Sequence, residues 1–117
     1  GIVGLTGFVS DAPAALRSLD VVVHASTAAE PFGLVVAEAM AAGRAVVISN
    51  NGGVAELVAS GTTGLAYDSG SVEGLTSAVT RLVDDAGFRE AIGRRARTAA
   101  IEQFDPGRLT RQMLALY

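Results

Sequence analysis

The chain of 117 residues contains no cysteine, no lysine and no tryptophan. Without cysteine it can form neither a disulfide nor a thiolate metal site, and without lysine it has no side-chain amine for a Schiff base or for neutralising a phosphate group. Its nine basic side chains are all arginines, and twelve acidic residues outnumber them to give a net charge of -3. Nucleic-acid-binding domains usually present a basic face, so this balance argues against that class.

Long apolar runs are also missing from the sequence. No stretch reaches the roughly 18 apolar residues that a membrane span requires. Half of all residues are nevertheless hydrophobic, at 50%, which is enough for a packed core and excludes a disordered tail. The chain begins at Gly1 with neither an initiator methionine nor a signal-peptide pattern, and we therefore expect it to be a piece of a longer polypeptide.

Short apolar runs alternate with segments of helical periodicity, a pattern typical of βα units around a parallel sheet. The predicted strands are 2–9, 20–25, 45–49 and 64–67, and the predicted helices between them are 13–19, 32–42 and 54–60. Apolar residues continue at helical spacing after the last strand, which predicts further helices towards the C-terminus. The fold class is therefore α/β, a Rossmann-like parallel sheet with flanking helices. Gly43 is expected to end the second helix.

Two carboxylates, Glu30 and Glu38, lie around the start of a predicted helix. Pro31 suits a first helical turn, where its missing N–H needs no partner, and Gly33 allows a ligand to approach the backbone closely. Amides at a helix start, with the positive end of the dipole behind them, favour a bound anion such as phosphate. Glu38 lies roughly 7–8 Å beyond Gly33 along the helix axis. This distance suits a diphosphate at the helix start and a ribose at Glu38.

Ligands of open parallel sheets bind outside the carboxyl ends of the strands. The loops in this position are 10–11, 26–32 and 50–53. Taken alone, Glu30 could be a solvated carboxylate beside a helix start, and Glu38 a surface residue. Gly52 and Gly53 could likewise form an ordinary turn.

Four consecutive motifs, however, resemble the retaining glycosyltransferases of family 4, also called the group 1 glycosyltransferases. The segment 30–38 matches their Glu-x7-Glu motif, and the similarity continues in AMAAG (39–43) with the strand AVVIS (45–49), in GGVAELV (52–58) and in GTTGLA (61–66). The resemblance implies the GT-B fold, in which two Rossmann-like domains face a cleft. Residues 1–117 would then be part of the C-terminal, nucleotide-sugar-binding domain, comprising about its last four βα units and the C-terminal helices.

The resemblance implies an enzyme that transfers a sugar from a nucleoside-diphosphate-sugar donor to an acceptor with retention of the anomeric configuration. The acceptor could be a sugar, a lipid or a small molecule, and an N-terminal domain absent from this chain would bind most of it. No cofactor, metal ion or nucleic acid is implied. The family's diphosphate-binding Arg and Lys would precede Gly1, so we expect the chain alone to be inactive. The implied location is the cytoplasm, with the inner face of a membrane as an alternative.

The same resemblance assigns roles to individual residues. Glu30 would contact the donor sugar and favour the positive charge that develops there, which makes it the candidate catalytic residue but not a nucleophile. The amides of Phe32, Gly33 and Leu34 would contact the sugar and the diphosphate, and Glu38 would hold the ribose. The further donor-binding candidates are Gly52 and Gly53, through close backbone approach, and Val9 and Ser10, beside the nucleobase.

The expected strand order follows from the same comparison. Rossmann-like sheets run in the order 3-2-1-4-5-6, and the resemblance places the four predicted strands third to sixth. Strands 20–25, 45–49 and 64–67 should then form a contiguous parallel trio, with strand 2–9 apart from them.

Two alternatives to this enzyme remain open. A non-catalytic sugar-nucleotide-binding or regulatory module of the same fold would keep Glu38 but tolerate loss of Glu30. A GT-B relative such as an epimerase or a phosphorylase would carry a different signature in place of residues 30–33. The single histidine, His24, is more typical of a structural role than a catalytic one, and the arginines at 94, 95 and 97 are interpreted as a solvated face.

Overall fold

The structure is a computed structural model in which residues 16–25, 34–51 and 55–103 are described. Strands β1 (Val21–His24), β2 (Ala45–Ser49) and β3 (Leu65–Tyr67) form one parallel sheet in the order β1-β2-β3. The predicted contiguous trio of parallel strands is therefore confirmed. The predicted strand 2–9 lies outside the described residues, and its position stays a prediction.

The central strand, β2, is buried along its whole length. Successive side chains of a strand point to opposite faces of the sheet. Accordingly, Val46 and Ile48 belong to one apolar cluster, and Ala45 and Val47 belong to another. Cover on both faces explains why this strand reads as an unbroken apolar run in the sequence.

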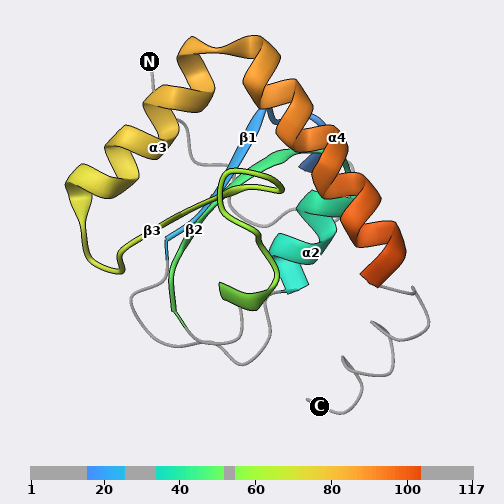
Figure 1. Cartoon of the computed structure of the whole chain (residues 1–117), viewed down its shortest axis with the longest axis horizontal. Coiled ribbons are helices and arrows are strands. Elements are labelled where there is room, and N and C mark those ends of the chain that lie inside the picture. Colours follow the sequence, from blue (N-terminus) through green and yellow to red (C-terminus); the bar gives the residue numbers. More distant parts are fainter. Residues whose placement is uncertain (1–15, 26–33, 52–54, 104–117) are drawn as a thin grey trace.

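Three helices of the described part of the chain cover the two faces. Helix α2 (Leu34–Ala41) connects β1 to β2, and α3 (Val72–Asp84) and α4 (Ala86–Gln103) follow β3. Met40 of α2 packs in one apolar cluster and Leu82 of α3 in the other, whereas α4 contributes to both, through Ala96 and Ala100 in the first and Ile92 in the second. Figure 1 shows α3 and α4 meeting at an angle over the sheet, with α2 beside the second half of α4. The first two helices predicted after the last strand are thus confirmed, and the helical spacing predicted over 109–116 lies outside the described residues.

The turn from α2 into β2 depends on Gly43, whose φ is 75°. The Gly43 N–H donates to the Met40 carbonyl at 2.9 Å, and the Arg44 N–H donates to the Ala39 carbonyl at 3.0 Å. These two bonds form a Schellman motif, which satisfies carbonyls at the helix end. A side chain would be strained at this φ, so the predicted helix end at Gly43 is confirmed together with its physical reason.

The predicted helix over 54–60 is wrong in its described part, where a single 3₁₀ turn is followed by irregular chain and an isolated β-bridge between Ser60 and Gly64. Two hydroxyl side chains accept hydrogen bonds from backbone N–H groups in and beside this segment. The Ala59 N–H donates to the Thr63 hydroxyl at 2.9 Å, and the Ala66 N–H of β3 donates to the Ser60 hydroxyl at 3.1 Å. A helix this short gains little from its own hydrogen bonds, so bonds to the turn and to β3 decide the path of the chain.

Helix α3 begins directly after Ser71, whose hydroxyl accepts a hydrogen bond from the Gly74 N–H at 2.9 Å. We expect Ser71→Ala to lower the free energy of unfolding by about 1 kcal/mol, because this amide loses its partner. Chemical denaturation measures the change. Ser77→Ala makes the same substitution at an exposed position of the same helix, and it should leave stability unchanged or slightly higher. Equal losses in the two variants would contradict the capping role of Ser71.

Candidate functional site

The carboxyl ends of the strands form one edge of the sheet. β1 ends at His24 and β2 at Ser49, and the parallel register places His24 opposite Ile48. The Asn50 N–H donates to the Tyr67 carbonyl at 2.8 Å, which ties the segment after β2 to β3. An open parallel sheet binds its ligands at this edge.

Most of the predicted site residues belong to segments that adjoin these strands in the sequence. Glu30, Phe32 and Gly33 fall between β1 and α2, Gly52 and Gly53 fall soon after β2, and Val9 and Ser10 precede β1. All of them lie outside the described residues, so their roles stay predictions.

Helix α2 presents its amino terminus to the same edge. It begins at Leu34 and leads from the carboxyl end of β1 to the amino end of β2, so the parallel topology places its first turn beside the carboxyl ends. Amides of a first turn have no partner within their helix, and the dipole is positive there. Val36, Ala39 and Met40 are completely buried in the cluster with β1 and β2. This packing holds the helix in an orientation that favours an anion at the edge.

Glu38 is the predicted site residue whose side chain the structure describes. It lies in the second turn of α2, about 6 Å along the axis from Leu34, and it is half-buried between the buried Ala37 and Ala39. Among the described residues, no group forms a hydrogen bond or an ion pair with its carboxylate. Its oxygens are therefore available to accept from the hydroxyl groups of a ligand.

Two further findings concern the described residues alone. No group of three or more His, Asp or Glu side chains in this part of the chain could hold a metal ion. None of its helices combines the length and the apolar composition that crossing a bilayer demands.

A cavity at the opposite edge of the sheet was not predicted from the sequence. Its volume is about 500 Å³, and its charged lining consists of Arg44, Arg89, Arg94 and Arg97 with Asp20 and Glu90. We call it the arginine cavity. Asp20 and Arg44 directly precede β1 and β2, so the cavity lies at the amino ends of the strands. One signal was present in the sequence, because Arg89 and Arg97 lie four residues before and after Gly93 and so share a helix face with it.

Comparison with known sequences gives a family and several relatives. The family model described as "Glycosyl transferases group 1" matches residues 2–99. The glycogen synthase of Mycobacterium tuberculosis strain H37Rv is 43% identical over 76 residues, which cover 65% of this chain and 18% of that protein. An uncharacterised glycosyltransferase of Methanocaldococcus jannaschii is 35% identical over 101 residues, covering 86% and 26%. The chain thus spans about a quarter or less of the length of these relatives.

Solved structures share the fold. HepE of Anabaena, in a complex with UDP-glucose, matches with a TM-score of 0.85 and 33% identity over 95% of this chain and 30% of that chain. The C-terminal domain of LpcC of Francisella tularensis, a group 1 family glycosyl transferase, matches with a TM-score of 0.77 and 26% identity, over 88% and 52%. The predicted Rossmann-like parallel sheet of a C-terminal GT-B domain is therefore confirmed.

Proposed function

Since the chain belongs to the glycosyl transferases of group 1, we propose that it forms the donor side of a retaining glycosyltransferase. Such an enzyme transfers a sugar from a nucleoside diphosphate to an acceptor and retains the configuration of the anomeric carbon. One observation carries the proposal: the amino terminus of α2 lies at the carboxyl edge of the sheet, and the half-buried Glu38 follows one turn later without a partner among the described residues.

The spacing of these two features suits a nucleoside diphosphate. The diphosphate would lie at the first turn of α2, where the amides of Phe32, Gly33 and Leu34 and the helix dipole favour negative charge. The ribose would lie beside Glu38, whose carboxylate can accept hydrogen bonds from both vicinal hydroxyl groups. The complex of HepE with UDP-glucose supports a uridine diphosphate sugar as the donor.

The chemistry follows from the charges that develop as the donor breaks down. When the bond between the sugar and the diphosphate breaks, the leaving group becomes more negative and the anomeric carbon more positive. The start of α2 would stabilise the first charge, and the carboxylate of Glu30 would stabilise the second. Glu30 acts here as an electrostatic group and not as a nucleophile.

The remaining contacts complete the donor site in this proposal. Gly52 and Gly53 allow the backbone to approach the donor, and Val9 and Ser10 lie beside the base. Because the matched relatives are several times longer than this chain, residues 1–117 would act as one part of a larger enzyme, whose other parts bind the acceptor and supply cations for the diphosphate. The chain alone is then expected to be inactive.

Glu38 gives the most direct test of this proposal. We expect Glu38→Ala to weaken the affinity of the enzyme that carries this chain for UDP at least tenfold, because two charge-assisted hydrogen bonds to the ribose are lost. Isothermal titration calorimetry with UDP measures the change. The substitution should not disturb the fold, since alanine is a good helix former and the Glu38 carboxylate has no partner among the described residues.

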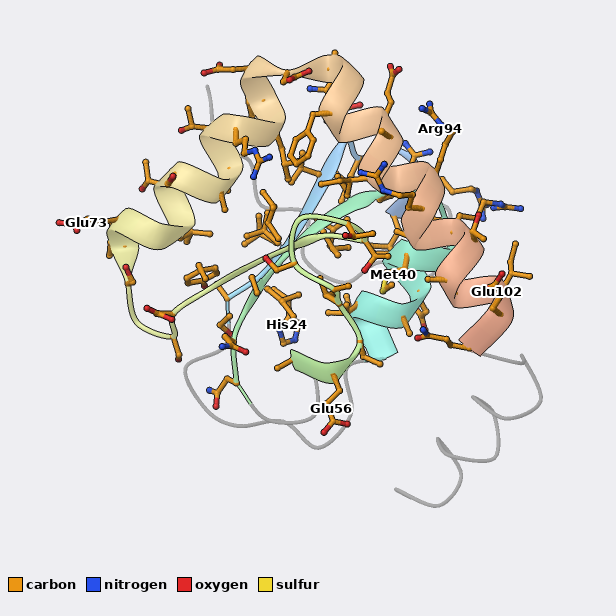
Figure 2. The ribbon with its side chains drawn as sticks, viewed as in Figure 1. His24, Met40, Glu56, Glu73, Arg94 and Glu102 are labelled. Carbon is orange, nitrogen blue, oxygen red and sulfur yellow. The ribbon has the colours of Figure 1, made fainter. Side chains whose placement is uncertain are left out.

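Glu73→Ala provides the matched control. Glu73 is exposed on α3 and projects away from the sheet in Figure 2, so its removal should leave UDP affinity unchanged. Unchanged affinity in Glu38→Ala as well would remove Glu38 from the nucleotide site and contradict the proposed orientation of the donor.

A further inference from the structure

The arginine cavity concentrates positive charge in a chain whose net charge is -3. Four arginines line it against two carboxylates. Among the described residues, no ion pair joins Asp20 or Glu90 to any of the four guanidinium groups, and the lining carries more positive than negative charge. A cavity of about 500 Å³ has the size of a small-molecule site.

Two of the four guanidinium groups donate hydrogen bonds to backbone carbonyls near the end of α2, and one of the two also donates to a carbonyl before β1. Arg97 donates from Nη1 to the Ala41 carbonyl at 2.9 Å. Arg44 donates from Nε to the Ala42 carbonyl at 3.2 Å and from Nη1 to the Leu19 carbonyl at 3.0 Å. A guanidinium group has five N–H donors, so these anchors fix the groups and leave donors for a ligand.

The other two arginines come from α4. Arg89 donates from Nη1 to the Leu82 carbonyl at 2.9 Å, at the end of α3. The guanidinium of Arg94 forms no hydrogen bond or ion pair with any described residue. Figure 2 shows Arg94 at the end of the molecule opposite Glu56. Within the described part of the chain, Arg94 is therefore an unpaired cation beside three arginines that bind backbone carbonyls.

A purely structural role explains only part of this arrangement. Cations near the C-terminus of a helix stabilise its carbonyls, which accounts for Arg97 and Arg44 at the end of α2. It does not account for Arg94, whose guanidinium binds no carbonyl of a described residue. It also does not explain why four guanidinium groups line one hollow instead of spreading over the surface.

We propose that the arginine cavity binds the phosphate group of a soluble, phosphorylated small molecule. The planar guanidinium fork matches the oxygens of a phosphate, and several guanidinium groups attract a dianion more strongly than a monovalent anion. The hollow shape suits a small molecule better than the flat surface of a membrane. The ligand would lie at the amino ends of the strands, whereas the start of α2 lies at the carboxyl ends, so it would not compete with a nucleotide there. This inference does not rest on the proposed transferase function.

The test is a titration of the protein with inorganic phosphate, compared with sodium chloride at equal ionic strength. The NMR signals of the arginine Nε–H groups report where the phosphate binds. We expect saturable shifts at Arg44, Arg89, Arg94 and Arg97. We expect none at Arg95, which does not line the cavity and whose Nε donates a hydrogen bond of 2.8 Å to the Thr62 carbonyl. Sodium chloride should produce no saturable shift.

A variant pair then identifies the ligand contact. Arg94→Gln should weaken phosphate binding about fivefold, as expected for a charge-assisted hydrogen bond from an exposed side chain. It should leave the melting temperature unchanged, because the Arg94 guanidinium forms no hydrogen bond or ion pair with a described residue. Arg95→Gln removes the same charge one residue away and should leave the affinity nearly unchanged. Equal weakening in both variants would overturn the proposal, as would the absence of saturable shifts with phosphate. Binding to phosphatidylglycerol vesicles without binding of free phosphate would also overturn it.

Discussion

Replacement of Glu30 by glutamine is expected to lower the turnover of the enzyme that carries this chain by on the order of a hundredfold. In the proposed site, the carboxylate favours the positive charge that develops on the donor sugar, and an amide of nearly the same shape lacks that charge. The interaction strengthens only in the transition state, so the affinity for UDP should stay nearly unchanged. Steady-state kinetics give the turnover, and calorimetry gives the affinity.

Glu102→Gln makes the same isosteric change at an exposed position of α4 and should alter neither quantity (Figure 2). A parallel loss of turnover and UDP affinity in Glu30→Gln would indicate that Glu30 faces the nucleotide. The roles proposed for Glu30 and Glu38 would then have to be exchanged.

Replacement of Gly93 by alanine is expected to destabilise the fold, although the same change inside a helix normally stabilises a protein by about 1 kcal/mol. Gly93 is buried in α4, and a Cβ atom there would overlap the carbonyl oxygen of Gly43 in the turn before β2. No side chain can rotate to relieve this overlap, because the obstacle is backbone. Helix α4 must move away from the turn, at a cost of about 1–3 kcal/mol. Chemical denaturation measures the loss.

Gly87→Ala is the matched control, because it makes the same substitution on the same helix. Its added Cβ would lie 3.5 Å from the Asp85 carboxylate, which is an ordinary contact. This variant should keep or slightly raise the stability. If Gly93→Ala were as stable as Gly87→Ala, this would contradict the close packing of α4 on the turn before β2.

The sequence predicts those parts of the fold that depend on local signals. The strand 45–49 contains the apolar run 45–48 and was predicted with the observed bounds. Gly43 provides the positive φ that ends α2, so the end of this helix, predicted at residue 42, was correct to within one residue. The segment 54–60 was wrongly predicted as a helix because its path depends on hydrogen bonds that backbone amides donate to the Ser60 and Thr63 hydroxyls. Apolar periodicity over seven residues does not reveal such bonds.

The same distinction holds for the two sites. The place of Glu38 one turn after the start of α2 could be predicted because both lie in one helix, and its role stays a prediction. The arginine cavity could not be, since its lining comes from segments before β1, before β2 and within α4. Arg94, Arg95 and Arg97 were interpreted as a solvated face, and all three side chains are exposed. The sequence did not reveal that Arg95 binds the Thr62 carbonyl while the other two line the cavity.

Helix α4 is the described helix with buried side chains in both apolar clusters, through Ile92 on one side and Ala96 and Ala100 on the other. If α4 detaches, both apolar clusters therefore lose part of their helical cover at the same time. The two layers should therefore open as one cooperative unit rather than as separate foldons. Because Arg94 and Arg97 lie on this helix, a ligand that binds only the native arrangement of the arginine cavity would protect the whole unit against opening by mass action.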